Sequence, residues 1–488
     1  MKLIIKAFAL FIANGLFAQA EFCGTRIEDQ QQALNSIDGL PYVYRQDNAI
    51  TYIPLMVHNV TNDNSNSFFA AWPLFETLCT LNSDFLPTGF QFYLERGFNY
   101  IRNSEWNNHE DFQKGEEMMV ESNIPEMVNC YLVSDPAGNC GYFTYSGDGV
   151  ALNKTCLGKY SHTWAHELGH FFSLPHTFYG WEGIRYSSSK KTSEYQGDVF
   201  RQIENVVRAQ CKRQADYFCD TNPDYISYRW SCNQDGFSSL IMRDVNDSTF
   251  RADGSLFMSY SNDQCMNRFS TEQMDAMHKS LNGPRAELIR PDVVPSFITQ
   301  SQLNLTFPSD SLTVVSKNLE VSWEAVENAT YYVLQISRTS NFSVVVKNLL
   351  LTSNKVDIDS LTQGKNYWWR VRAFSDFDFC GIESSVGHFK TQADPVSTDQ
   401  IFASELNLFP NPIRNSEKLQ IEIPEHLDFN QIKEVKLISA KGGTLSDLHF
   451  SQLENRILVD LDNLSTGFYL INLKTESGNY YSKISIQD

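Results

Sequence analysis

Residues 166–176 read His-Glu-Leu-Gly-His-Phe-Phe-Ser-Leu-Pro-His, and this stretch decides the fold of the region around it. His166 and His170 are four positions apart, so on a helix both imidazoles lie on one face and can bind one metal ion. His176 can join them only if the chain leaves the helix after His170 and folds back. Three imidazoles and one water form the open tetrahedral zinc site of a catalyst, whereas structural zinc is usually closed by cysteines.

A glutamate, Glu167, follows the first histidine. It is wrongly placed to share the metal with its neighbour but well placed to accept a proton from a zinc-bound water. Helices also carry His-Glu-x-x-His by chance, and a histidine pair can be purely structural. The third histidine favours the metal site, so we expect one catalytic zinc bound by His166, His170 and His176.

A second feature lies downstream, where residues 257–266 read Phe-Met-Ser-Tyr-Ser-Asn-Asp-Gln-Cys-Met. Together with the histidine motif, this segment resembles the metzincin metallopeptidases, in whose Met-turn a methionine lies beneath the zinc ligands. The resemblance implies that Met258 has this place. It also implies that the phenol of Tyr260 stabilises the oxyanion of the reaction, although simple packing of this tyrosine is an alternative.

Within that clan the chain resembles the pappalysin family, in particular its cytophagalysin-like members, over residues 45–285. The segments that carry the resemblance are residues 52–58, 81–85, 162–165, 175–178, 219–224 and 269–273. It implies an α+β catalytic domain at residues 45–290, with a twisted sheet, a zinc helix at residues 160–173 and the Met-turn. One departure is Ser173, where the metzincin pattern has glycine; a left-handed backbone there would cost about 1–2 kcal/mol.

The same resemblance implies binding sites beyond the zinc. Asp263 corresponds to a pocket aspartate that would pair with an arginine or lysine just past the scissile bond. Asp220, Thr221 and Asp224 resemble a calcium-stabilised loop, although a solvated acidic loop has the same composition.

Ten cysteines in a chain with an export signal favour disulfide bonds. The resemblance implies the pairs Cys211–Cys219 and Cys232–Cys265. Cys23 has two readings: its thiolate can bind the zinc and keep the enzyme latent, as a Cys-Gly-Thr segment near the mature start of the family suggests, or it can form an ordinary disulfide.

The N-terminus is predicted to be an export signal followed by a short segment, residues 21–44, which we call the lead. Residues 1–20 have two lysines, a short apolar run and Ala-Gln-Ala at the end, which is typical of a secretory signal peptide. Residues 21–44 are either an ordered edge of the catalytic domain or a pro-segment, with a helix expected near residues 27–36. We expect no transmembrane segment in the mature chain, because no stretch has the roughly 20 apolar residues that are needed.

The C-terminal half changes character after a linker at residues 291–308. Residues 309–392 show strand-like alternation and resemble a fibronectin type III β-sandwich. Residues 405–488 resemble the C-terminal sorting domain of the type IX secretion system of Bacteroidota, a second all-β sandwich. That resemblance implies the type IX machinery as a partner, passage through the periplasm of a Gram-negative bacterium, and a secreted or cell-surface protein.

The 488 residues carry a net charge of −19, and no basic patch suggests nucleic acid as a partner. The sequence therefore predicts a secreted multidomain zinc endopeptidase that acts on protein or peptide substrates, with Glu167 as general base. The alternative is a catalytically silent surface adhesin whose fibronectin-like module carries the function. A zinc hydrolase of non-peptide amides is a third reading, which the Met-turn disfavours.

Overall fold

The computed structural model describes residues 22–41, 49–195, 203–392, 401–402, 406–414, 417–423, 429–439, 444–453, 456–461, 464–475 and 479–487. The expected signal peptide at residues 1–20 lies outside this range. The chain divides into two units, of which the first holds the histidine motif and one β-sandwich, and the second holds another β-sandwich. In the described residues, no helix is long and apolar enough to cross a membrane.

A twisted sheet forms the part of the first unit that precedes the histidine motif in sequence. Its strand order is β2-β1-β5-β8-β7, and β3 also pairs with β1. The pairs of β1 and the pair β5–β8 are parallel, whereas β7 runs antiparallel to β8 at the edge of the sheet. The bounds of these strands are β1 Thr51–Thr61, β2 Phe90–Tyr93, β3 Phe98–Arg102, β5 Val128–Val133, β7 Gly141–Thr144 and β8 Gly149–Asn153.

Both faces of this sheet are buried, which explains why β5 has no exposed residue. Leu132 packs toward a core that includes Phe75 of α2 and Leu168 of α5. Its neighbour Tyr131 points the other way, to a cluster with Met118 of α4, because successive side chains of a strand alternate. The helices of this region are α2 Ala71–Phe85, α3 Ser104–Asn107, α4 Phe112–Ser122, α5 Thr163–Phe171 and α6 Thr271–Asn282.

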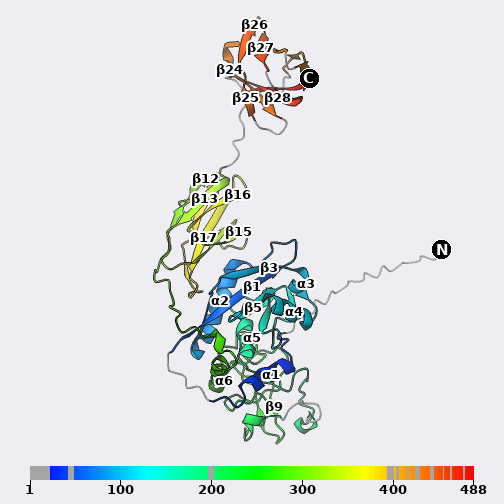
Figure 1. Cartoon of the computed structure of the whole chain (residues 1–488), viewed down its shortest axis with the longest axis vertical. Coiled ribbons are helices and arrows are strands. Elements are labelled where there is room, and N and C mark those ends of the chain that lie inside the picture. Colours follow the sequence, from blue (N-terminus) through cyan, green and yellow to red (C-terminus); the bar gives the residue numbers. More distant parts are fainter. Residues whose placement is uncertain are drawn as a thin grey trace, which may run out of the picture. The chain divides into compact units, whose positions relative to one another are not determined.

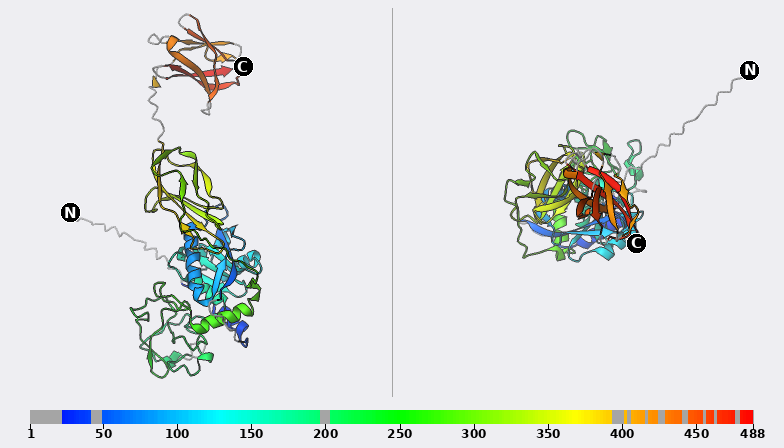
Figure 2. Two further views of the ribbon diagram at one scale, coloured as in Figure 1. Left: turned by 90° about the vertical axis from the view of Figure 1, so that its left-hand side faces the viewer. Right: turned by 90° about the horizontal axis from the view of Figure 1, so that it is seen from above.

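The N-terminal lead is ordered over residues 22–41 and contains α1 (Ile27–Ile37), close to the predicted bounds. This helix lies next to α5 and α6, below the sheet in Figure 1. The blue α1 and the green α6 are again side by side in Figure 2. The start of α6 has a capping box, in which the side chains of Ser270 and Gln273 each bond to the other residue's backbone N–H.

The first sandwich consists of the sheets β11-β13-β16 and β12-β19-β17-β14-β15. It begins earlier than expected, because Leu305–Phe307 pairs with β13 and so belongs to the sheet and not to a linker. Its strands are β11 Leu305–Phe307, β12 Leu312–Val314, β13 Lys317–Trp323, β14 Tyr331–Ser337, β15 Val345–Leu351, β16 Lys355–Ser360, β17 Asn366–Phe374, β18 Ile382–Glu383 and β19 Gly387–Thr391. Trp323 and Trp369 are buried between the sheets.

This sandwich is joined to the region of the same unit that holds the histidine motif. A disulfide links Cys79 of α2 to Cys380, across a sequence separation of 301. Phe75 of α2 stacks on Phe374 of β17 at a centroid distance of 3.9 Å. A covalent bond beside a buried aromatic contact makes the first sandwich a fixed part of this unit.

The second unit is a sandwich of its own, with the sheets β20-β29-β28-β24-β25 and β21-β23-β27-β26. Alternate residues such as Leu419, Ile421, Ile471 and Leu473 are buried between them. Its strands are β20 Ile401–Phe402, β21 Leu408–Phe409, β22 Ile413–Arg414, β23 Lys418–Glu422, β24 Ile432–Ser439, β25 Thr444–Asp447, β26 Phe450–Leu453, β27 Arg456–Asp460, β28 Gly467–Thr475 and β29 Asn479–Gln487.

Candidate metal centre

The helix α5 carries the first two histidines and ends where the third must fold back. Ser173 has a positive φ of 73°, so the left-handed conformation that the departure from glycine puts in question is kept. Its cost of about 1–2 kcal/mol is offset by the C-terminal hydrogen bonds of the helix, including Leu174 N–H to Gly169 O at 2.9 Å. The chain then turns through Pro175 and brings His176 beside His170.

An oxygen atom near Nδ1 of each imidazole orients the ring. His166 Nδ1 lies 2.6 Å from Phe257 O, and His170 Nδ1 lies 2.7 Å from Leu174 O. His176 Nδ1 lies 3.1 Å from Gln30 Nε2 and 3.2 Å from a carboxylate oxygen of Glu182, and the bond to Glu182 is the one in which Nδ1 donates. A hydrogen bond donated from Nδ1 leaves the lone pair on Nε2, which is the tautomer that a metal ligand needs.

Burial keeps the three rings neutral. All three histidines are almost fully buried. Desolvation lowers the pKa of His166 and His170 well below the usual value, and it lowers the pKa of His176 to about 3. Neutral imidazoles bind metal ions, whereas imidazolium ions do not.

Cys23 completes the cluster. Its Sγ lies 3.6 Å from His170 Nε2. Cys23, His166, His170 and His176 each offer one ligand atom, and these four atoms lie within 4.8 Å of one another. Cys23 is free and buried, so the ordinary disulfide that was one reading of this residue does not form.

Two distances in the cluster are close to those between the ligands of a tetrahedral zinc ion. With Zn–N bonds of about 2.0–2.1 Å and a Zn–S bond of about 2.3 Å, tetrahedral ligands lie roughly 3.3–3.6 Å apart. His170 Nε2 and His176 Nε2 are 3.1 Å apart, and Cys23 Sγ is 3.6 Å from His170 Nε2. His166 Nε2 is buried and has no hydrogen-bond partner among the described residues. A buried, unpartnered nitrogen aimed at two other nitrogens is costly unless a metal ion binds it.

Glu167 lies beside the cluster in a dry position. Its Oε2 accepts a hydrogen bond from Thr25 Oγ1 at 3.0 Å and lies 3.5 Å from Cys23 Sγ. Its Oε1 is buried without a partner among the described residues. Burial raises the pKa of Glu167 to about 8, and a nearby divalent cation would favour the charged carboxylate.

The Met-turn segment forms the floor of the site. Met258 is fully buried, and its carbonyl accepts a hydrogen bond from Thr177 N–H at 3.1 Å. Gly169 allows the side chain of Met258 to pack directly against α5, because a Cβ at this position would lie 2.3 Å from Met258 Sδ. Tyr260 packs edge-on against His176 and donates its hydroxyl hydrogen to Cys23 O at 2.9 Å.

Asp263 lies at the edge of the site but already has partners. Its Oδ1 accepts a hydrogen bond from His162 N–H at 3.0 Å, and its Oδ2 forms an ion pair with Arg229 at 2.8 Å. Asp263 therefore does not present a free negative charge, although the resemblance alone implies one. Nothing in the sequence near Asp263 indicates this arginine, because the two residues meet only in the fold.

The three expected calcium residues have other bonds. Asp220 accepts hydrogen bonds from Ser270 Oγ and Glu272 N–H at the start of α6. Both oxygens of Asp224 are also occupied, and Thr221 Oγ1 donates a hydrogen bond to Asp216 Oδ1 at 3.2 Å. Through these hydrogen bonds, Asp220 and Asp224 connect neighbouring segments of this part of the fold.

A different pair of carboxylates in the same region lacks partners. Both oxygens of Glu204 and Oδ2 of Asp216 are buried without a hydrogen bond among the described residues. Burial raises the pKa of both groups, and Glu204 raises that of Asp216 further. Two dry carboxylates with unused oxygens fit a hard cation. The sequence analysis missed this pair, because the two residues are twelve positions apart in a segment without a recognisable pattern.

Four disulfides occur in the described residues, and two are the pairs implied by the resemblance, Cys211–Cys219 and Cys232–Cys265. Cys140–Cys156 and the bond to Cys380 were not predicted, since spacing alone cannot give connectivity.

Comparison with known proteins identifies the last unit. Residues 407–487 match the family described as the secretion system C-terminal sorting domain. This match indicates export by type IX secretion and a secreted or cell-surface location. The comparison with curated proteins gives no match.

Solved structures similar to part of the chain include fibronectin type III modules. The fibronectin(III)-like modules of CbhA from Clostridium thermocellum show 16% identity, cover 19% of this chain and 95% of their own, and have a TM-score of 0.14. An Fn3-like protein from the same organism shows 20% identity over 20% and 95% of the two chains, with a TM-score of 0.14. The sixth such domain of human fibronectin type III domain containing protein 3 shows 18% identity over 21% and 92%, with a TM-score of 0.15. The β-sandwich is established by the strand topology of this chain, because TM-scores this low carry no argument about the fold.

Proposed function

We propose that this chain is a secreted zinc-dependent endopeptidase in a latent form. The observation that carries the proposal is the convergence of three neutral imidazoles and one thiol within 4.8 Å, with the carboxylate of Glu167 beside them. An adhesin needs neither this donor set nor a buried carboxylate next to it.

His166, His170 and His176 are the residues that would hold the zinc. When bound there, zinc supplies Lewis acidity, which activates a water and polarises a carbonyl group. Glu167 is the general base: it accepts a proton in a pocket that excludes solvent and later returns it to the leaving amine. Tyr260 supports the carbonyl oxygen, because its hydroxyl already donates to a carbonyl that lies over the histidines, that of Cys23.

Latency in this proposal comes from residues 22–25. The Cys23 thiol lies where a water would have to bind, and the backbone of Gly24 donates a hydrogen bond to Gly141 O of the edge strand β7 at 2.8 Å. Thr25 holds Glu167 through its hydroxyl group. The segment therefore covers the metal ligands, the base and the sheet edge on which an extended substrate would lie.

Cleavage-site profiling by mass spectrometry tests the peptidase. We expect the N-terminally trimmed protein to cut a peptide library in the presence of zinc, and Glu167→Ala to lose activity by about 10²–10⁴-fold. Zinc content separates the roles, because Glu167→Ala should still bind one zinc ion, whereas His170→Ala should not. If no cut depends on Glu167 after trimming, the silent adhesin is the better description.

The full chain tests latency. Cys23→Ala should be active before any trimming, whereas the parent should be inactive. The control is Cys130→Ser, which removes the other free cysteine of the described residues, a buried residue of β5, and keeps an acceptor for the hydrogen bond from Trp164 Nε1. Equal activity of the parent and Cys23→Ala before trimming would contradict the proposal.

A structural calcium ion is the second part of the proposal, at Glu204 and Asp216 in place of the loop residues expected from sequence. Calcium should raise the midpoint of thermal unfolding of the parent, and Asp216→Asn should remove most of this response. An unchanged response in the variant would exclude this pair.

The sorting domain supplies the export part of the proposal: the protein passes through the periplasm of a Gram-negative bacterium before it is released or attached at the cell surface.

A further inference from the structure

A cavity of about 670 Å³ lies beside the histidine cluster. Its wall includes Tyr260 and Asp263 of the segment that follows Met258, Thr163 at the start of α5, and Arg229. These elements also position the metal ligands, so a chain lying over the histidines would direct a side chain into this cavity. The cavity therefore has the place of a substrate subsite.

A residue of the protein's own N-terminal lead forms part of the wall of this cavity. Phe22, the residue before Cys23, lines the cavity and is only 7% exposed. Its ring packs edge-on against His166 at 4.9 Å and against Tyr260 at 5.3 Å. An aromatic side chain thus already lies in contact with a metal ligand and with the cavity wall.

The charges of the cavity do not favour a cationic side chain. Arg229 and Asp263 are the ionisable Arg, Lys, Asp or Glu residues among its described lining residues, and they form an ion pair with each other. The guanidinium of Arg229 lies 3.8 Å from the ring centroid of Phe22. An incoming lysine or arginine would meet this cation and a neutralised carboxylate, whereas an aromatic face attracts the guanidinium.

We propose that this cavity is the subsite for an aromatic side chain next to the scissile bond, that Phe22 covers its Arg229 and Tyr260 wall in the latent protein, and that Arg229 sets the preference. The proposal rests on the peptidase function above and replaces the arginine or lysine preference that Asp263 implies by resemblance. Arg229 acts here as a specificity residue, because it selects the side chain and takes no part in bond cleavage.

The first test is the cleavage profile of the trimmed protein. Phenylalanine, tyrosine and tryptophan should be enriched next to the cut over lysine and arginine on the order of tenfold. Arg229→Ala frees Asp263 and should move the ratio toward lysine and arginine by a similar factor. The control Arg102→Ala removes an arginine that lies 5.2 Å from the ring of Phe68, outside the cavity, and should leave the profile unchanged. Enrichment of lysine and arginine by the parent would overturn the proposal.

The second test needs no catalysis and uses the full chain. The rate at which a thiol reagent labels Cys23, located by peptide mapping, reports how often residues 22–25 leave the site. Phe22→Tyr should label nearly as slowly as the parent, and Phe22→Lys about tenfold faster or more. Slow labelling of Phe22→Lys together with fast labelling of Phe22→Tyr would show a cationic subsite and overturn the proposal.

The two tests separate the two proposals. If no cut depends on Glu167, the peptidase function fails, and the labelling series still decides which side chain the cavity accepts. If the cuts depend on Glu167 but show no aromatic enrichment, the peptidase function stands and the subsite proposal fails.

Discussion

Two segments enclose the histidine cluster, and they are built differently. Residues 257–260 of the Met-turn segment are buried and held by backbone hydrogen bonds: Phe257 N–H donates to Arg268 O at 2.9 Å, and Met258 O accepts a hydrogen bond from Thr177 N–H at 3.1 Å. The lead at residues 22–41 is held mostly by side-chain hydrogen bonds and ion pairs. Gln30 is the clearest case, because its Oε1 accepts the His176 N–H at 3.0 Å and its Nε2 donates to Thr25 O at 3.2 Å.

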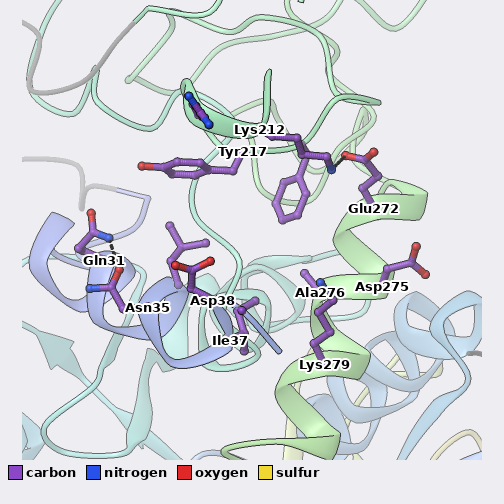
Figure 3. A pocket seen from close by; sticks show the side chains of 14 residues that line it. Gln31, Asn35, Ile37, Asp38, Lys212, Tyr217, Glu272, Asp275, Ala276 and Lys279 are labelled. Carbon is purple, nitrogen blue, oxygen red and sulfur yellow. Dashed lines mark hydrogen bonds and ion pairs between the residues drawn. The ribbon is translucent and has the colours of Figure 1, made fainter. Parts of the chain in front are cut away.

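The packing behind the two segments differs as well. A cavity of about 810 Å³ lies between α1, α6 and the loop that holds Lys212 and Tyr217. Figure 3 shows Gln31 and Asn35 of α1, with Asp38 just after the helix, on one side of it and Lys279 of α6 on the other. By contrast, Gly169 leaves no room between α5 and Met258. The lead therefore borders open space on the side of α1 that faces α6, whereas Met258 is enclosed by protein.

The largest effect should follow from a cavity created at the buried residue Met258. Met258→Ala should lower the free energy of unfolding of the first unit by about 2–5 kcal/mol, since a buried side chain is deleted and a cavity is left. Met258→Leu keeps the volume and should cost less than about 1.5 kcal/mol. Denaturant unfolding followed by tryptophan fluorescence measures both. If Met258→Ala unfolds with the same free energy as the parent, the Met-turn segment is not packed more tightly than the lead, and the comparison fails.

A smaller effect should follow from a change in the buried contacts of the lead. Gln30→Ala leaves the His176 N–H without its partner, which costs about 1–3 kcal/mol and should speed the labelling of Cys23 by about fivefold or more. The neighbouring change Gln31→Ala is the control, because Gln31 bonds to Asn35 in an exposed position. If both variants label at the rate of the parent, the lead does not depend on its polar contacts.

The smallest effect should come from the partly exposed end of the lead. Arg26 forms ion pairs with Asp29 at 2.6 Å and with Glu116 at 2.5 Å, and its side chain is 38% exposed. Such pairs contribute about 0–1 kcal/mol, so Arg26→Ala should speed labelling of Cys23 by no more than about fivefold. The effect should shrink further at high salt. An effect larger than that of Gln30→Ala would reverse this order.

Several local features could be predicted from sequence because each depends on a few neighbouring residues. The capping box at Ser270 and the helix near residues 27–37 are determined by short-range hydrogen bonds and hydrophobic spacing. The early start of the first sandwich was missed, because Leu305–Phe307 becomes a strand only by pairing with β13. Spacing within the chain gives no information about such a partner.

The sequence by itself determined the set of chemical groups: the three histidines, the glutamate after the first of them, and a cysteine ahead of the domain. It did so because the spacing of His166 and His170 on a helix is a local property. Only the tertiary structure decided that Cys23 lies at His170 Nε2 and that Arg229 neutralises Asp263. These pairs are 147 and 34 positions apart, and contacts over such separations depend on how whole elements pack.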